Sequence, residues 1–396
     1  MKNSKKVKIF KNLNKPILIL TLVYAVMGAF LILDASSISS KLAFGVSYYY
    51  FKNQLTFIAA ALVASFFIIK FPTKLYKKIS GFLSMLFIGL ILFIYAKNKL
   101  FSSGVNEVTI PLFGFVIQPA EFLKVFLVMY MSSYYDDWVN NPKHGTWTFM
   151  WPLILCGSGM MLILLGGDFG SAAVMTAIFA LVFAVLPCKE KYVSIVKTIG
   201  IAGLLLCVFA LKFLYVVVPE ETLQSNYRLN RFIYKNPCDR YEENSGYQVC
   251  NGYIAIDNGG ILGSGIGGST QKYMYLPASH TDFIFPIVIE EFGVLSGIAI
   301  ILGYMVILYF IFKEATSSYK LQNSMICYGI GIYFMLHIFV NLGGVLGIMP
   351  LTGVPLPFLS YGGSFCVTII CAFAVVQRIS IENRIEKAKR LERREK

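Results

Sequence analysis

Residues 284–312 read IFPIVIEEFGVLSGIAIILGYMVILYFIF, an apolar run whose only charged side chains are Glu290 and Glu291. A helix needs about 20 apolar residues to cross the hydrocarbon core of a bilayer, so this run is long enough to span a membrane. Comparable apolar blocks lie elsewhere in the chain, for example at 79–96 and 170–187. The pattern predicts several membrane-spanning helices.

The overall composition agrees with this prediction. Hydrophobic residues make up 57% and charged residues 14% of the 396 positions, and the mean hydropathy is +0.66. Soluble domains carry roughly 25% charged residues, and no soluble fold of this length has enough interior for so much apolar surface. We do not expect a β-barrel, because barrel strands alternate apolar and polar residues and these blocks are continuously apolar. We therefore expect an all-α polytopic membrane protein.

Reading the apolar blocks in order predicts about ten transmembrane helices within one membrane domain that covers residues 1–396. The expected spans are 16–33, 54–71, 79–96, 119–134, 147–165, 170–187, 193–218, 284–312, 324–349 and 362–380.

The distribution of Lys and Arg predicts the orientation. Cytoplasmic loops of membrane proteins carry the excess of these residues, and long loops count for little. Most of them fall in the two basic tails, 1–15 and 381–396, and in alternate short loops. We therefore expect both termini in the cytoplasm. The net charge of +14 is then explained by attraction of the basic segments to anionic lipid headgroups. We expect no nucleic-acid partner, because aromatic residues do not interleave with the basic runs.

The segment 219–283, between the expected spans 7 and 8, is the only polar region large enough to hold a site of its own. This large extracytoplasmic loop contains Cys238 and Cys250, for which a disulfide and two free thiols are both open. The other six Cys lie in or beside spans as small core residues. The glycine-rich run 259–268 lacks the Lys-Ser/Thr of a phosphate-binding loop, and we interpret it as a tight turn.

Ionisable residues at membrane depth are costly and are therefore candidates for function. Glu121 and Lys124 lie three residues apart just after Pro119, so they share one helix face. We expect that face to line a polar cavity near the outer leaflet. The alternative is a structural ion pair between helices.

Two aspartates begin expected spans on the outer side. Asp168 can cap the helix that follows it, and only proximity to other polar groups would give it a further role. Asp282 meets water on one side and hydrocarbon on the other, which suits a carboxylate to proton abstraction, and His280 competes for that role. Glu290 and Glu291 lie too deep to act on the same atom, and we expect them to face other helices.

Three stretches carry a family resemblance. Residues 117–124 read IQPAEFLK, residues 275–285 read YLPASHTDFIF and lead to EEFG at 290–293, and residues 353–364 read GVPLPFLSYGGS. These motifs resemble the signature of the SEDS family, which includes RodA, FtsW and SpoVE. With the ten-span plan and the large outer loop, the resemblance covers nearly the whole chain.

The resemblance implies that the chain polymerises lipid II into glycan strands on the outer face of the bacterial cytoplasmic membrane. It also implies a class B penicillin-binding transpeptidase as partner, within the division or elongation machinery. The family's essential aspartate falls on Asp282, and its conserved Glu and Lys fall on Glu121 and Lys124. Its Pro-Asp-Leu-Gly motif falls on residues 167–170, with departures at Gly167 and Phe169 that leave the role of Asp168 less secure.

The chemistry expected from this resemblance is a single inverting displacement. Asp282 takes the proton of the acceptor 4-hydroxyl while a lipid pyrophosphate leaves, so one carboxylate is enough. Cations stabilise the leaving group, and Arg231, Lys272 and Lys124 are candidates. A divalent cation could share this task, although no cluster of metal ligands in the sequence requires one. The remaining substrate-binding candidates within the motifs are Asp168, His280, Thr281, Pro355 and Ser360.

Two other classes of protein fit some of these features. A lipid II flippase would also use a buried ion pair, and the proline-rich segment 353–361 could act as its gate, although no inverted repeat is evident. A noncatalytic cell-wall scaffold would give Asp282 only a structural role. Residues 268–272, GSTQK, favour the FtsW or SpoVE branch over RodA.

Overall fold

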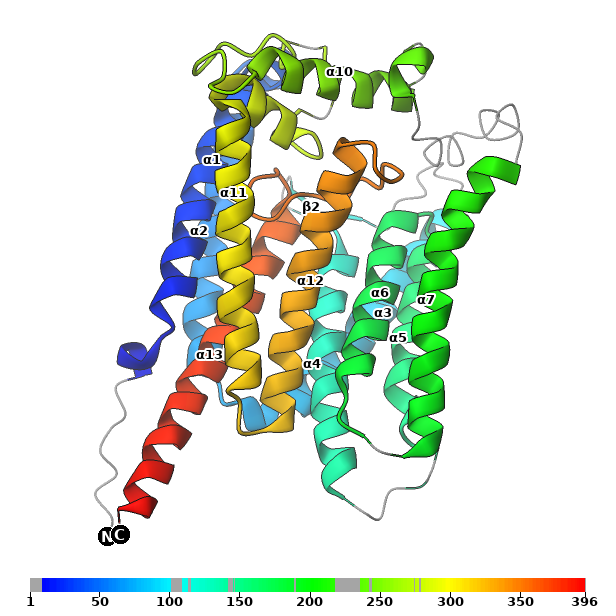
Figure 1. The fold of residues 1–396 in the computed structure, drawn as a ribbon, viewed down its shortest axis with the longest axis vertical. Helices are drawn as coiled ribbons and strands as arrows, with labels where there is room; N and C mark the ends of the chain where they lie inside the picture. Colours follow the sequence, from blue (N-terminus) through cyan, green and yellow to red (C-terminus); the bar gives the residue numbers. More distant parts are fainter. Residues whose placement is uncertain are drawn as a thin grey trace.

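A computed structural model describes residues 9–100, 109–112, 115–141, 145, 147–188, 190–217, 236–241, 244–273, 275–277 and 279–395. These residues form a bundle of long, roughly parallel helices with one helix lying across its end (Figure 1). The helices are α1 (Lys15–Phe44), α2 (Tyr49–Lys70), α3 (Tyr76–Leu100), α4 (Pro119–Asn140), α5 (Met150–Leu165), α6 (Phe169–Val185), α7 (Lys191–Val217), α10 (Asn244–Gly259), α11 (Ile284–Thr316), α12 (Leu321–Val345) and α13 (Gly363–Arg394).

Short elements complete the described part of the chain. They are the 3-10 helices η1 (Ile9–Asn12), η2 (Thr73–Leu75) and η3 (Pro237–Arg240), and the antiparallel hairpin of β1 (Ile110–Leu112) and β2 (Phe115–Ile117). The all-helical prediction is therefore confirmed apart from this small hairpin.

Each expected span overlaps one helix. Six helices, α1, α2, α3, α11, α12 and α13, are long and apolar enough to cross a membrane, and α5 and α6 are shorter apolar helices. Large apolar side chains such as Phe30, Phe82, Phe93 and Leu302 are exposed on the outside of the bundle. An apolar exterior of this kind is suited to lipid.

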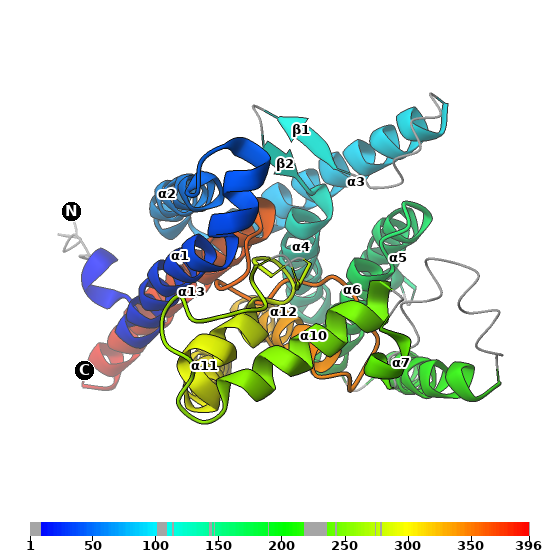
Figure 2. The ribbon, with the colours of Figure 1, turned by 90° about the horizontal axis from the view of Figure 1, so that it is seen from above.

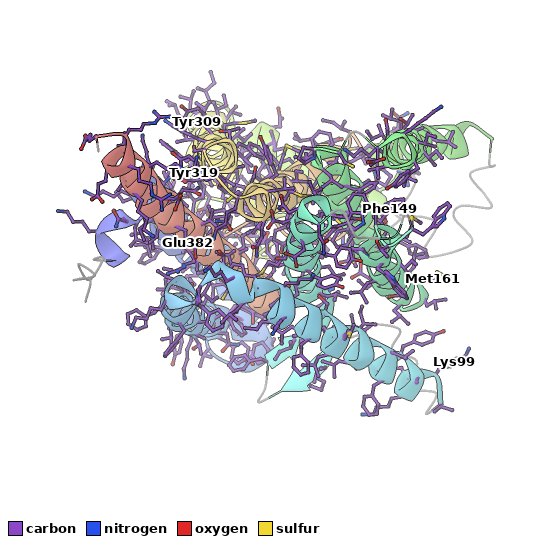
Figure 3. The ribbon with its side chains drawn as sticks, turned by 90° about the horizontal axis from the view of Figure 1, so that it is seen from below. Lys99, Phe149, Met161, Tyr309, Tyr319 and Glu382 are labelled. Atoms are coloured by element: carbon purple, nitrogen blue, oxygen red, sulfur yellow. A yellow bond between two sulfur atoms is a disulfide. The ribbon has the colours of Figure 1, made fainter. Side chains whose placement is uncertain are left out.

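The C-terminal basic segment continues the last helix. Helix α13 continues to Arg394 rather than ending near residue 380, and Glu386 and Arg390 form an exposed pair one turn apart on it. Glu382 accepts hydrogen bonds from the backbone and hydroxyl of Thr73, which join α13 to the α2–α3 connection. Figure 3 views the molecule from this end and labels Glu382 on α13.

The two ends of the bundle differ. Helix η1 and the end of α13 lie together at one end, where Gln377 exchanges hydrogen bonds with the backbone of Asn14. Helix α10 lies across the opposite end, over α12 and towards α7 (Figures 1 and 2). Helices α12 and α13 are the most enclosed of the long helices, so the core lies around them.

Candidate active site beneath the crossing helix

Helix α11 is interrupted at Gly293, and the glycine-rich run after α10 forms hydrogen bonds with the backbone at this interruption. At Gly293 the backbone has φ 79° and ψ 167°, which interrupts the helix. The freed groups pair with the run: Val294 N donates to Gly260 O at 3.0 Å, and Ser264 N donates to Glu290 O at 2.9 Å. A β-carbon on Gly293 would lie 2.1 Å from the carbonyl oxygen of Ile261, so only glycine fits. The expected tight turn is confirmed, and its partner is α11.

The carboxylates of Glu290 and Glu291 mainly face this loop, and Glu290 also accepts a hydrogen bond from Asn258 of helix α10 at 3.1 Å, so the expectation that both face other helices is met only for Glu290. Glu290 accepts from the Thr270 backbone at 3.1 Å and from the Thr270 hydroxyl at 2.9 Å. Glu291 forms an ion pair with Lys272 at 2.5 Å. Both glutamates are buried, and buried carboxylates need such partners. They hold the loop to the N-terminal part of α11.

Lys272 lies inside a three-residue charge network. Its ammonium group also pairs with Asp34 of α1 at 2.8 Å, and its side chain is buried. Burial alone would lower the pKa of Lys272, but the hydrogen bonds to Asp34 and Glu291 outweigh it and raise that pKa. The ammonium group is therefore charged and already neutralised by two carboxylates, which leaves it little capacity for a phosphate.

The two cysteines of the segment 219–283 are joined. Cys238 of η3 and Cys250 of α10 form a disulfide. This bond ties η3 to the crossing helix and settles the alternative that the sequence leaves open.

The main chain leading into α11 is held at three successive carbonyls. Tyr361 N donates to His280 O at 2.8 Å, Ser360 Oγ donates to Thr281 O at 2.6 Å, and Asn341 Nδ2 donates to Asp282 O at 3.0 Å. The structure thus brings Thr281 and Ser360 together beside Asp282. The position of the Asp282 backbone is determined by α12 and by the segment before α13.

The carboxylate of Asp282 lies against an exposed glycine turn. Asp282 is half-buried, and a β-carbon on Gly353 would lie 3.5 Å from its Oδ2. Gly353 has φ 72°, a conformation that favours glycine. The turn therefore presents backbone rather than a side chain to the carboxylate. Pro355 follows two residues later.

The same turn reaches Asp168. A β-carbon on Gly170 would lie 2.4 Å from the carbonyl oxygen of Thr352, so α6 begins directly against the turn. Asp168 accepts from Ser171 N at 2.9 Å, which confirms the expected N-cap. It also accepts from Gln118 Nε2 at 2.9 Å. Asp168 therefore has the additional polar neighbour that would give it more than a capping role.

Glu121 and Lys124 form an ion pair at 2.7 Å, with 3% and 0% of their side chains exposed. Tyr333 of α12 donates its hydroxyl to Glu121 Oε2 at 3.2 Å. The shared helix face is confirmed, but the pair is enclosed by α12 and does not line an open cavity. Tyr333 closes the space that the sequence suggested would be polar and open.

His280 stacks among aromatic rings at the N-terminal end of α2. Its ring centroid lies 4.4 Å from that of Tyr50 and 5.9 Å from that of Tyr361. Burial lowers the pKa of His280 from 6.5 to about 4. His280 is therefore neutral at neutral pH and holds a proton weakly.

Several polar atoms around Asp282 are buried and have no hydrogen-bond partner among the described residues. They are His280 Nδ1, Asn341 Oδ1 and Thr352 Oγ1. Buried polar groups are normally paired, so these atoms offer donors and acceptors to a polar ligand or to water. No group of three His, Cys, Asp or Glu side chains suited to a metal ion occurs in the described ranges.

One predicted site residue cannot be placed, and three residues of the site were not predicted from the sequence. Arg231 lies outside the described residues. Gln118, Tyr333 and Asn341 contact predicted site residues, although the sequence did not single them out. A spacing signal existed for two of them, because Tyr333 and Asn341 lie eight residues apart on one face of an apolar helix.

Comparison with known proteins gives a consistent result. Residues 15–385 match the family model of FtsW, RodA and SpoVE, described as a cell cycle protein. The "Probable peptidoglycan glycosyltransferase FtsW" of Coxiella burnetii is 32% identical over 92% of this chain and 95% of its own length. The stage V sporulation protein E of Bacillus subtilis is 28% identical over 92% of this chain and 96% of its own length.

Solved structures share the fold. A chain from a study of polymerization and crosslinking by a peptidoglycan synthase complex aligns with a TM-score of 0.69 at 20% identity, covering 94% of this chain and 98% of that chain. The rod shape determining protein RodA of Thermus thermophilus aligns with a TM-score of 0.64 at 18% identity, covering 94% and 97% of the two chains.

Proposed function

The chain belongs to the FtsW/RodA/SpoVE family, and from this premise we propose that it is a peptidoglycan glycosyltransferase that polymerises lipid II on the outer face of the cytoplasmic membrane. The observation that carries the proposal is the setting of Asp282. Its backbone is held by α12 and the 360–361 segment, and its carboxylate lies against the exposed Gly353 turn. A half-buried carboxylate at the end of a helical bundle is suited to deprotonating a hydroxyl of a membrane-bound substrate.

We propose that all ten apolar helices cross the membrane, with both termini in the cytoplasm. Short apolar helices such as α5 and α6 are then the spans nearest the minimum length. The grouping of η1 with the end of α13, and of α10 with the opposite end, supports this arrangement. It places Asp282 and the crossing helix on the extracytoplasmic side.

The proposed reaction is one inverting displacement. The acceptor sugar's 4-hydroxyl oxygen attacks the anomeric carbon of the donor, the carbon–oxygen bond to the lipid pyrophosphate breaks, and Asp282 receives the hydroxyl proton. Positioning of both sugars supplies much of the rate, because a correctly oriented pair of reactants reacts far faster than a free one. Among the buried polar atoms near the carboxylate, Thr352 Oγ1 is available for a sugar hydroxyl.

The cations near the site have different proposed roles. Lys272 is held between Asp34 and Glu291, and we assign it to fixing the loop rather than binding pyrophosphate. Lys124 is paired with Glu121, so it can reach a substrate only if that pair rearranges. Arg231 therefore stays a candidate for the leaving group, and a divalent cation could act beside it.

We propose a class B penicillin-binding transpeptidase as the partner. The related solved chain comes from a complex that coordinates polymerization and crosslinking, which supports a joint assembly for this chain as well. The FtsW and SpoVE names of the sequence relatives favour a role in division or sporulation over elongation. A fluorescent fusion at the septum supports that choice, and a sidewall pattern contradicts it.

Product formation by the purified protein tests the proposal against a flippase and a scaffold. The protein is purified in detergent with its transpeptidase partner, the partner is blocked with a β-lactam, and fluorescent lipid II is added. The proposal expects a ladder of glycan strands on a gel. Lipid II that crosses vesicle membranes without lengthening would support the flippase, and no change in either assay would support the scaffold.

A further inference from the structure

One face of α12 carries three polar side chains at four-residue intervals, Tyr333, His337 and Asn341. Residues four apart lie on one side of a helix, so the three form a continuous stripe. At one end Tyr333 contacts Glu121, and at the other end Asn341 contacts the backbone of Asp282. The stripe thus runs from the buried ion pair to the proposed base.

Asn341 is the part of the stripe that touches the active site. Its Nδ2 donates to Asp282 O at 3.0 Å and to Val354 O at 2.8 Å. Both partners are carbonyls, which accept only, so the orientation of the amide is determined and both donors are used. The Oδ1 atom has no partner among the described residues, and the side chain is 4% exposed.

These two bonds join the segments that meet at the carboxylate. Asp282 lies on the connection into α11, and Val354 follows Gly353, the glycine that lies against Asp282 Oδ2. One amide therefore sets the spacing between the base and the turn beside it. Misplacement of a reacting group by about 1 Å can cost 10²-fold in rate, so such a spacer matters to catalysis.

We propose that Asn341 is a positioning residue for glycosyl transfer, acting through the main chain of Asp282 and the Gly353–Val354 turn. This inference rests on the proposed function of the same site. Asn341 touches neither sugar in this account, and it acts by holding the base in place. An aliphatic residue of similar size would remove both hydrogen bonds and leave the two segments free to separate.

Two titratable neighbours of Asn341 are identified among the described residues. His337 lies one turn away on α12, with its ring stacked on Phe365 at 4.5 Å between centroids. Asp282 lies on the connection into α11. The segment 350–357 carries no titratable side chain. A carboxyl introduced at position 341 would therefore respond mainly to pH and to these two neighbours.

The test uses Asn341→Asp, which keeps the size of the side chain. When ionised, the introduced carboxyl has no donor for the two carbonyls, and when protonated it regains one. We expect kcat for lipid II polymerisation to fall about 10- to 100-fold at pH 8 with little change in KM. We also expect the ratio of variant to wild-type kcat to rise as the pH is lowered towards 5.5.

Asn323→Asp is the matched control. Asn323 lies on the same helix, is 1% exposed and also has an unpartnered Oδ1, but it is far from Asp282 along α12. We expect this control to cost stability without the pH-dependent recovery of kcat. Asn341→Ser, which is neutral and keeps one donor, should lose less rate than Asn341→Asp and addresses any failure of the aspartate variant to fold.

The results separate this inference from the proposed function. If the wild type polymerises lipid II and Asp282→Asn does not, but Asn341→Asp and Asn341→Ser keep wild-type kcat and pH profile, the positioning role is overturned. An equal loss in Asn341→Asp and Asn323→Asp, with parallel pH profiles, also overturns it. If the wild type itself makes no glycan, the proposed function fails first.

Discussion

Gly353 lies directly against Asp282: a β-carbon at position 353 would lie 3.5 Å from the carboxylate oxygen Oδ2. The two residues are far apart in sequence, and they meet because the turn before α13 folds back to the start of α11. The turn therefore places backbone, and no side chain, beside the carboxylate. We propose that the acceptor hydroxyl binds at this position.

Gly353→Ala should therefore reduce polymerisation. The added methyl group fills space beside the carboxylate, and φ of 72° is unfavourable for alanine by about 1–2 kcal/mol. We expect a loss of kcat of about tenfold or more in the gel assay. Gly45→Ala is the matched control, because Gly45 has φ 76° and nothing within 4 Å of its would-be β-carbon. Equal activity of the two variants would contradict the role of the turn.

The enclosed pair Glu121–Lys124 should contribute to both stability and activity. Lys124→Met leaves the Glu121 carboxylate buried without its cation, and removing one partner of a buried pair typically costs about 3–5 kcal/mol. We expect a clearly lower thermal unfolding midpoint in detergent.

The double variant Glu121→Gln with Lys124→Met separates the two roles. It removes both charges, so the unfolding midpoint should recover most of the loss. Polymerisation should stay low if the pair has a role in the reaction. Full recovery of activity would show that the pair is structural only.

The break at Gly293 predicts a defect transmitted to the active site. Gly293→Ala places a β-carbon 2.1 Å from Ile261 O, which displaces the glycine-rich run from α11. We expect faster hydrogen exchange in residues 259–268 and lower kcat. Gly265→Ala is the control, since it shares a positive φ of 91° but meets nothing within 4 Å. Equal hydrogen exchange in the two variants would contradict the inference that Gly293 allows the glycine-rich run to pair with α11.

His280→Phe tests which residue is the base. Phenylalanine keeps the ring contact with Tyr50 and cannot titrate. We expect polymerisation at pH 7 to persist, because a His with a pKa of about 4 holds a proton weakly. Loss of turnover with intact folding would transfer the role of base to His280.

The same variant should change the dependence of stability on pH. The folded pKa of about 4 lies below the ordinary value of 6.5, so between these values the unfolded chain binds the proton more readily. The free energy of unfolding should therefore fall as the pH drops from 6.5 to 4. Unfolding midpoints at pH 7 and pH 5 should show a smaller fall in His280→Phe than in the wild type.

Much of the fold could be predicted because long apolar runs indicate helices that lie in lipid. The runs located every long helix, and the three-residue spacing of Glu121 and Lys124 placed them on one face. The capping role of Asp168 followed from its position before an apolar block. These features depend on local sequence.

The features that were missed depend on tertiary contacts. Nothing in residues 284–312 marks Gly293 as a break, because its φ of 79° is supported by a turn from another segment. Glu290 and Glu291 could not be assigned to the loop for the same reason. Tyr333 closes the space around the ion pair from a distant helix, so the expected cavity is filled.

The most direct test of the account compares Asp282→Asn with Asp257→Asn in one preparation with the transpeptidase partner. Asp257 is an exposed aspartate of α10 and serves as the control. Lipid II binding and single-turnover glycan formation are measured for each. The account predicts that Asp282→Asn binds lipid II but forms no glycosidic bond, whereas Asp257→Asn matches the wild type. Glycan formation by Asp282→Asn at the wild-type rate would contradict it.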